Sequence, residues 1–121
     1  MTIEKFVGFM SEIGMKAELI KGADNVEYIV VRDLIIPNGG LKGRRCDVAI
    51  QKGGVPFLPA AAIHTRPALV EMKMMDPLKT QGSKIGTDWQ YWSRRFDKVP
   101  TPKDLWARIL TILCDPRWTP V

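Results

Sequence analysis

Residues 101–116 read TPKDLWARILTILCDP, which is the pattern of a capped and buried helix. Thr101 is placed to cap this helix, Pro102 occupies its first turn, and Asp104 completes a capping-box pattern. The apolar residues that follow recur at helical spacing over a broad face: Leu105, Trp106, Ile109, Leu110, Ile112 and Leu113. A face this broad predicts a helix that packs against the rest of the protein and ends at Pro116.

A second helix is predicted near the N-terminus, over residues 2–13. Its apolar residues fall on one helix face: Ile3, Phe6, Val7, Met10 and Ile13. Thr2 can cap its first turn, and Gly14 ends it. We therefore expect the fold to begin with an amphipathic helix.

Between the two helices, four segments have the composition of β-strands. Residues 17–21 and 26–32 are rich in aliphatic residues and flank the turn-like sequence GADN, which predicts a hairpin. Residues 45–51 alternate strictly between apolar and polar side chains and predict a third strand. A turn over residues 53–59 leads to a fourth strand at residues 60–65. We expect these strands to form a four-stranded antiparallel meander.

The segment from residue 66 to residue 100 has weak periodicity and is interrupted by prolines and glycines. We predict a long, largely irregular loop here, of the kind that is usually functional or partly disordered. Trp89, Trp92 and Phe96 recur at helical spacing and predict one short helix within it. An N-terminal helix, a meander, a long loop and a central helix together make a single α+β domain over residues 1–121.

The composition is that of a soluble globular domain. Hydrophobic residues make up 45% of the 121 residues and charged residues 26%, and no run approaches the roughly 20 apolar residues that a membrane span needs. Residues 1–15 carry Glu4, Lys5 and Glu12 within their apolar pattern, so they do not resemble a signal peptide and we expect a cytoplasmic location. The net charge of +5 favours acidic partners, either a negatively charged protein surface or nucleic acid.

Cofactor chemistry has little support in the sequence. Two cysteines and one histidine are too few for a structural zinc site, which needs four such ligands at paired spacings. We find neither a Gly-rich phosphate loop nor paired acidic residues at catalytic spacing. We therefore expect no metal and no cofactor.

Three motifs resemble ubiquitin-conjugating (UBC) enzymes and their small bacterial relatives. Residues 55–59, VPFLP, resemble the turn after the third strand of that fold, and residues 109–116, ILTILCDP, resemble the end of its central helix. Residues 89–95, the WQYWSRR segment, are similar to the Trp-x-x-Trp-Ser-Arg sequence of a bacterial UBC-like group found beside ubiquitin-like proteins and activating enzymes. The resemblance implies a minimal UBC-like fold without the two helices that follow the central helix in larger members. It also implies a ubiquitin-like protein and an activating enzyme as partners.

The sequence between Cys46 and Cys114 contains no cysteine. UBC enzymes carry their cargo as a thioester on a cysteine in the loop before the central helix, shortly after a His-Pro-Asn triplet. Residues 69–99 contain neither feature. Cys46 lies on the apolar face of its strand, and the resemblance places Cys114 at a non-catalytic position, so we expect both to be packing thiols. We therefore predict a docking or adaptor module without a thioester cysteine, a pseudo-conjugating enzyme.

His64 is the only side chain that titrates near neutral pH without a large pKa shift. In one interpretation it is a hydrogen-bonded histidine beneath the long loop. In another it faces Ser93 or Thr80 and supports an oxyester in place of the thioester, with Ser83 as a further candidate acyl carrier. The second interpretation predicts a conjugating enzyme whose acyl carrier is a serine or threonine.

The WQYWSRR segment combines aromatic and basic residues. Tyr91, Arg94 and Arg95 are expected to form a partner-binding face. Trp89 and Trp92 are also candidates for partner binding, although they are expected to fill the core at least in part. Tryptophan, tyrosine and arginine dominate interface hot spots, which supports this division. A third hypothesis takes the segment as a platform for single-stranded nucleic acid, on which aromatic stacking and cations act together.

Overall fold

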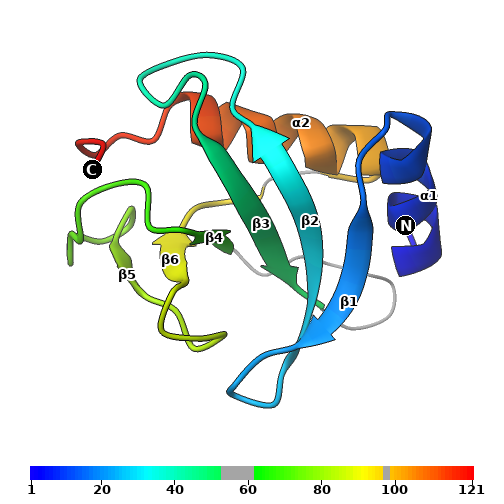
Figure 1. Cartoon of the computed structure of the whole chain (residues 1–121), viewed down its shortest axis with the longest axis horizontal. Coiled ribbons are helices and arrows are strands. Elements are labelled where there is room, and N and C mark those ends of the chain that lie inside the picture. The colour runs from blue at the N-terminus through cyan, green and yellow to red at the C-terminus, as the bar shows by residue number, and fades with distance from the viewer. Residues whose placement is uncertain (53–61, 97–98) are drawn as a thin grey trace.

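The computed structural model describes residues 1–52, 62–96 and 99–121, and over these residues it shows an α+β fold with two helices and one antiparallel sheet (Figure 1). The elements follow one another along the chain as α1 (Ile3–Glu12), β1 (Ala17–Lys21), β2 (Glu27–Ile35), β3 (Arg45–Gln51), β4 (Ala62–Arg66), β5 (Thr80–Gly82), β6 (Gln90–Ser93) and α2 (Pro102–Cys114). The order of strands in the sheet is β1-β2-β3-β4-β6-β5, and all neighbours pair antiparallel. The α+β class is confirmed, and the predicted meander corresponds to β1–β4. The sheet has six strands, however, not four.

Both helices begin at a threonine that caps them, as predicted. Thr2 Oγ1 accepts a hydrogen bond from the Lys5 amide at 3.2 Å, and Thr101 Oγ1 accepts one from the Asp104 amide at 3.2 Å. Capping satisfies amide groups that have no partner within the helix, so interactions local in sequence set both starting points.

No helix in the described part of the chain is long and apolar enough to cross a membrane.

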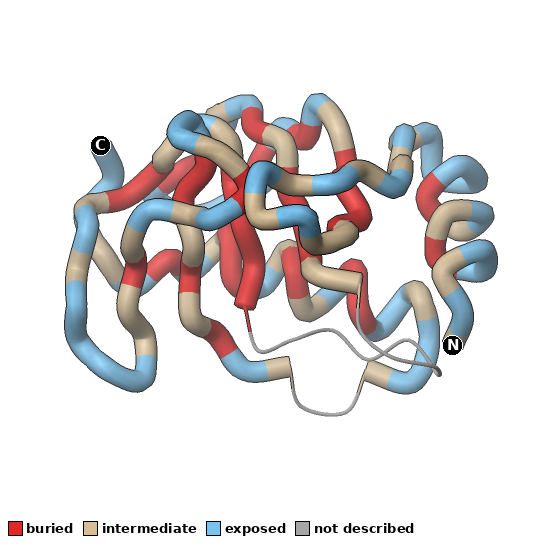
Figure 2. The backbone as a smooth tube through the Cα atoms, turned by 90° about the horizontal axis from the view of Figure 1, so that it is seen from below, coloured by how far each residue is buried: buried red, intermediate tan, exposed pale blue. Residues whose placement is uncertain are grey.

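The two helices pack on one face of the sheet and form the main core with it. Figure 1 shows α2 passing behind β2 and β3, with α1 beyond the β1 edge, and Figure 2 shows the buried stretches gathered along the middle of the molecule. The largest fully buried side chains are Phe6, Met10, Ile29, Ile36, Leu41, Ile50, Ile63, Leu69, Trp92, Leu105, Ile109 and Leu113. The broad apolar face predicted for residues 105–113 is therefore the face that covers the sheet.

The opposite face of the sheet carries a second, smaller apolar cluster. Tyr28 and Val30 of β2 and Ala49 of β3 pack there against Ile85 and Trp89. Because side chains alternate along a strand, these strand residues are the neighbours of core residues and point the other way. The chain between β5 and β6 supplies the covering side chains, so a segment predicted to be an irregular loop forms a third layer.

The short helix predicted around Trp92 is wrong, because residues 90–93 form β6. These residues pair with β4, from Ala62 opposite Ser93 to Thr65 opposite Gln90. A helix places residues three apart on one face, whereas a strand places them on opposite faces. Trp92 belongs to the main core and the tryptophan three residues earlier to the smaller cluster, as a strand requires. The open edge of β4 outweighs the helical spacing because it supplies a full set of backbone partners.

The predicted turn and the VPFLP motif at residues 53–59 lie outside the described residues. The first two residues predicted for the fourth strand, 60 and 61, do so as well. The described part of that strand is β4, which begins at Ala62 and continues one residue beyond the predicted end.

Candidate functional site

The tryptophans of the WQYWSRR segment are buried rather than displayed. Trp92 lies in the main core, where its Nε1–H donates to Thr65 Oγ1 at 3.1 Å. Trp89 is 4% exposed on the opposite face, and the guanidinium carbon of Arg66 lies 4.8 Å from the centre of its ring. Both tryptophans thus point inward, and neither leaves an open face on which a nucleic-acid base could stack.

Arg94 was predicted for the partner-binding surface but is only 4% exposed. Its guanidinium donates to three backbone carbonyls: Leu78 at 2.9 Å, Ser93 at 2.7 Å and Pro116 at 2.8 Å. These carbonyls belong to the segment before β5, to the end of β6 and to the segment after α2. A planar group with five N–H donors suits this task, so one side chain holds three distant parts of the chain together.

Tyr91 and Arg95 are the members of the predicted partner-binding face that remain accessible. Tyr91 is half-buried, and its ring meets the His64 ring edge-on with centroids 5.3 Å apart. Arg95 is exposed, and its backbone carbonyl accepts a hydrogen bond from Arg108 Nε at 2.7 Å. Arg95 is thereby linked to α2, and the neighbouring turns of α2 line a pocket.

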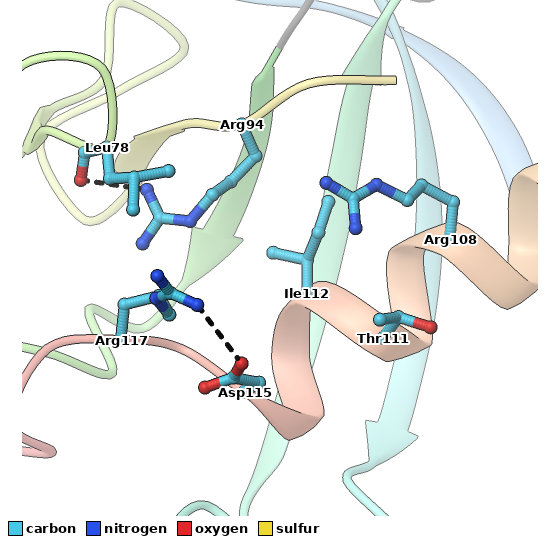
Figure 3. A pocket seen from close by; sticks show the side chains of 7 residues that line it. All are labelled: Leu78, Arg94, Arg108, Thr111, Ile112, Asp115 and Arg117. Atoms are coloured by element: carbon cyan, nitrogen blue, oxygen red, sulfur yellow. Dashed lines mark hydrogen bonds and ion pairs between the residues drawn. The ribbon is translucent and has the colours of Figure 1, made fainter. Parts of the chain in front are cut away.

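The pocket has a volume of about 190 Å³ and lies between the end of β6, the last turns of α2 and the segment after α2 (Figure 3). Its walls are the side chains of Leu78, Arg94, Arg108, Thr111, Ile112, Asp115 and Arg117. Figure 3 shows that the three arginines reach this space from different parts of the fold. The pocket, called the arginine pocket below, therefore collects three positive charges against one negative charge.

The three guanidinium groups of the arginine pocket differ in how many of their N–H donors already have partners. Arg117 Nη1 lies 3.6 Å from Asp115 Oδ2, and both side chains are more than half exposed. Arg108 has one donor engaged with a carbonyl, and Arg94 Nε is buried with no hydrogen-bond partner in the described ranges. Burial, reinforced by the charges of Arg117 and Arg108, lowers the pKa of Arg94 to about 10. The group stays charged at neutral pH, and an anion nearby would stabilise that charge.

His64 lies beneath the chain between β5 and β6, where it hydrogen-bonds with Ser83. Its side chain is 6% exposed, and its Nδ1 lies 2.8 Å from Ser83 Oγ. The rings of Tyr28 and Tyr91 meet it edge-on from two sides, at centroid distances of 5.2 Å and 5.3 Å. Burial lowers the pKa of His64 to about 4, and the charge of Asp24 opposes this shift only in part. The ring is therefore neutral at physiological pH.

The three hydroxyl groups considered as acyl carriers have different surroundings. Ser83 Oγ accepts a hydrogen bond from the amide two residues further on at 3.1 Å, in addition to its contact with His64. Thr80 is fully buried, and its hydroxyl donates to the Glu71 carbonyl at 2.6 Å. Ser93 is half-buried in β6. Of these candidates, the structure brings Ser83 to the histidine ring rather than Ser93 or Thr80.

The two thiols lie in the elements where the sequence places them. Cys46 is 3% exposed in β3, and burial, followed by the charge of Asp47, raises its pKa to about 12. Cys114 is half-buried at the last residue of α2 and packs against the main core. Within the described residues, no group of three or more histidine, cysteine or acidic side chains is arranged to hold a metal ion.

The arginine pocket contains residues that the sequence analysis did not select. Arg108 precedes Ile112 by one helical turn, which indicates a shared helix face but not a pocket. Leu78 and Arg117 lie far apart in sequence, and no pattern connects them.

No family model, curated protein or solved structure matches the chain.

Proposed function

We propose that the chain is a UBC-like component of a bacterial ubiquitin-like conjugation system and acts as a docking or adaptor module that carries no acyl group. The WQYWSRR segment and the ILTILCDP motif support this, because both resemble a bacterial UBC-like group. The element order also supports it: an N-terminal helix, an antiparallel meander, a crossing segment and a helix packed on the sheet. This is the order that the resemblance implies for a UBC-like protein.

The position of the thiols is the observation that carries the adaptor role. The resemblance implies an acyl-carrying cysteine between the fourth strand and the central helix, and residues 67–101 contain none. Cys46 is withdrawn into the core with a raised pKa, so its reactive thiolate form is disfavoured. Cys114 lies at the far end of α2, beyond the segment in which the carrier is expected. A module with these thiols can bind the components of a conjugation system without accepting the cargo.

Residues 67–96, which follow β4, are held in a defined conformation, which suits docking. Besides forming β5 and β6, they are clamped by Gln90, whose Oε1 accepts from the Leu69 amide at 3.0 Å and whose Nε2 donates to the Val70 carbonyl at 2.8 Å. A surface that is ordered before binding loses less conformational entropy when a partner arrives. The accessible side chains of this segment are therefore presented in a fixed arrangement.

Reconstitution with the ubiquitin-like protein and the activating enzyme of the same system tests the proposal. In the presence of ATP, we expect reversible binding to one of these proteins by calorimetry and no adduct on gels run with or without thiol reductant. A reductant-sensitive band that disappears in Cys114→Ala would overturn the adaptor role. Absence of binding to both proteins would overturn the assignment to such a system.

The contact between His64 and Ser83 favours a second candidate function, a conjugating enzyme with an oxyester on Ser83. A neutral imidazole 2.8 Å from a hydroxyl is within reach of its proton. Ser83 Oγ would attack the thioester carbonyl of the charged activating enzyme as the C–S bond breaks, and the hydroxyl proton would pass through His64 to the departing thiolate, since the buried ring does not stay protonated. In the same gels, this candidate predicts a band that resists reductant, yields to hydroxide and is lost in Ser83→Ala.

A further inference from the structure

The arginine pocket has an excess of positive charge that its own residues do not neutralise. Asp115 is the acidic residue among its lining side chains, lies 3.6 Å from Arg117 and is 68% exposed. An ion pair this exposed contributes little, so Arg117 can exchange it for another acid at small cost. Arg94 and Arg108 have no carboxylate within ion-pair distance in the described part of the chain.

Arg94 brings an unused donor to this space. Its two Nη atoms donate to backbone carbonyls, but its Nε is buried and has no acceptor among the residues that the structure describes. A buried N–H group without an acceptor is unfavourable and rare in folded proteins. Figure 3 shows the guanidinium groups of Arg94 and Arg117 next to one another at the pocket. An oxyanion that enters beside the exposed Arg117 would meet both groups and supply the acceptor that Nε lacks.

The size and the walls of the pocket fit a carboxylate on a short carbon stem. Its volume of about 190 Å³ is close to the roughly 150 Å³ that holds a benzene ring in an engineered cavity, and below the roughly 300–1,000 Å³ typical of drug-sized ligands. Leu78 and Ile112 form an apolar part of the wall. Carbon atoms next to a carboxylate can pack on this wall, whereas a hydrated inorganic phosphate has no such atoms.

We propose that the arginine pocket binds one carboxylate of a partner polypeptide, held by Arg94, Arg108 and Arg117. The carboxylate comes from an acidic side chain or from a C-terminus, since both present the same group on a carbon stem. The guanidinium fork matches either one through paired hydrogen bonds. This inference rests on the proposed function only in taking the partner to be a polypeptide, because the pocket itself can be examined with small probes.

Titration by NMR tests the pocket on the intact chain, labelled with ¹⁵N so that arginine Nε–H signals are visible. The carboxylate probes are N-acetylglycine, which ends like a polypeptide, and glutamate capped at both backbone ends, which presents an acidic side chain. The comparison probes are N-acetylglycinamide and inorganic phosphate. We expect saturable shifts of the Arg94 Nε–H and of the Thr111 and Arg117 amides with the carboxylates, no saturable shift with the amide, and weaker binding of phosphate.

Three variants separate a specific pocket from general positive charge. Arg117→Gln removes an exposed guanidinium group whose ion-pair partner, Asp115, is also exposed. We expect the Kd for N-acetylglycine to rise about tenfold, as for one lost charge-assisted hydrogen bond. Asp115→Asn removes the competing carboxylate and should lower the Kd. Arg95→Gln is the matched control, because it removes the same charge outside the pocket, and we expect a change within about twofold owing to screening.

Several results would overturn the carboxylate site. If Arg95→Gln and Arg117→Gln weaken carboxylate binding equally, the binding depends on net charge and not on the pocket. Shifts that never saturate would show that no defined site exists, and phosphate binding tighter than either carboxylate would assign the pocket to phosphoryl groups. Failure of the conjugation-system proposal would give a different result. The ubiquitin-like protein and the activating enzyme would not bind, while the small carboxylates would still bind to the arginine pocket.

Discussion

His64 is the only histidine of the chain, and its burial makes protonation of the ring unfavourable in the folded protein. The folded-state pKa is about 4, against an ordinary value of 6.5. Between these values the unfolded chain binds a proton that the folded chain does not, so the free energy of unfolding should fall as the pH drops through this window. The full shift corresponds to roughly 3 kcal/mol. Denaturant unfolding at several pH values across the window measures it.

The variant His64→Gln is the control for this pH dependence. A glutamine amide can still hydrogen-bond with Ser83 but does not titrate, so we expect most of the dependence to disappear. Burial raises the pKa of Asp24 and of Asp47, but their hydrogen bonds outweigh it and leave both pKa values below 3.8. These carboxyl groups therefore change the stability mainly at pH values below the window. Identical pH profiles for the parent and the variant would contradict the assignment to His64.

Arg94 and Arg95 are adjacent and chemically identical, yet we expect very different effects when each is replaced by alanine. Arg94→Ala leaves three backbone carbonyls without their donor and should lower the free energy of unfolding by about 2–4 kcal/mol. Arg95→Ala removes an exposed side chain and should change it by less than about 0.5 kcal/mol. Urea denaturation of the two variants gives both numbers. Equal losses would mean that the three contacts of Arg94 contribute nothing to stability.

At the scale of elements, the connection between β2 and β3 meets the end of α2 at Gly39. Gly39 has a φ of 84°, and a Cβ atom there would overlap the carbonyl of Cys114. Gly43 has a φ of 85°, but a Cβ atom there would meet open space. Replacement by alanine should cost roughly 1–2 kcal/mol of backbone strain at either glycine. Gly39→Ala must also displace the end of α2, so thermal unfolding should show a clearly larger loss than for Gly43→Ala.

The clamp that Gln90 forms between β6 and residues 69–70 makes a second prediction at this scale. Gln90→Leu keeps the bulk of the side chain but leaves the Leu69 amide and the Val70 carbonyl without partners, so we expect a loss of about 1–3 kcal/mol. The Leu69 amide should exchange its hydrogen faster than the overall loss of stability explains. Amides of β3 should slow or speed only as much as the change in global unfolding requires. Hydrogen exchange measured by NMR checks both. Unchanged exchange at Leu69 would show that other contacts hold this segment.

At the scale of the whole molecule, the positive net charge is not accompanied by exposed aromatic rings within residues 1–52, 62–96 and 99–121. Trp89, Trp92 and Trp106 are buried, and Trp118 is half-buried. Base stacking on aromatic rings is what makes single-strand binding strong. We therefore expect a single-stranded oligonucleotide to bind only through charge, with an affinity that falls steeply as salt rises and with unchanged tryptophan fluorescence. Salt-resistant binding with quenched fluorescence would favour the nucleic-acid hypothesis.

Part of the candidate site could be predicted from the sequence, and part could not. The inward position of Trp92 agrees with the expectation that this tryptophan fills the core, although the helical spacing used for it is wrong. A hydrogen-bonded His64 beneath the chain is one of two interpretations of the lone histidine. The burial of Arg94 could not be predicted, because two consecutive arginines are typical of an exposed surface segment. Its partners include the carbonyls of Leu78 and Pro116, and backbone carbonyls carry no sequence signal.

The sequence by itself determined both helices, their threonine caps and the strands β1 and β3, because these depend on periodicity and on contacts between residues close along the chain. Only the tertiary structure decided that residues 90–93 form a strand, since the free edge of β4 outweighs their helical spacing. The arginine pocket likewise exists only where the ends of β6 and α2 meet. Its charges come from residues as far apart as Arg94 and Arg117, and their proximity is a property of the packed molecule rather than of any local pattern.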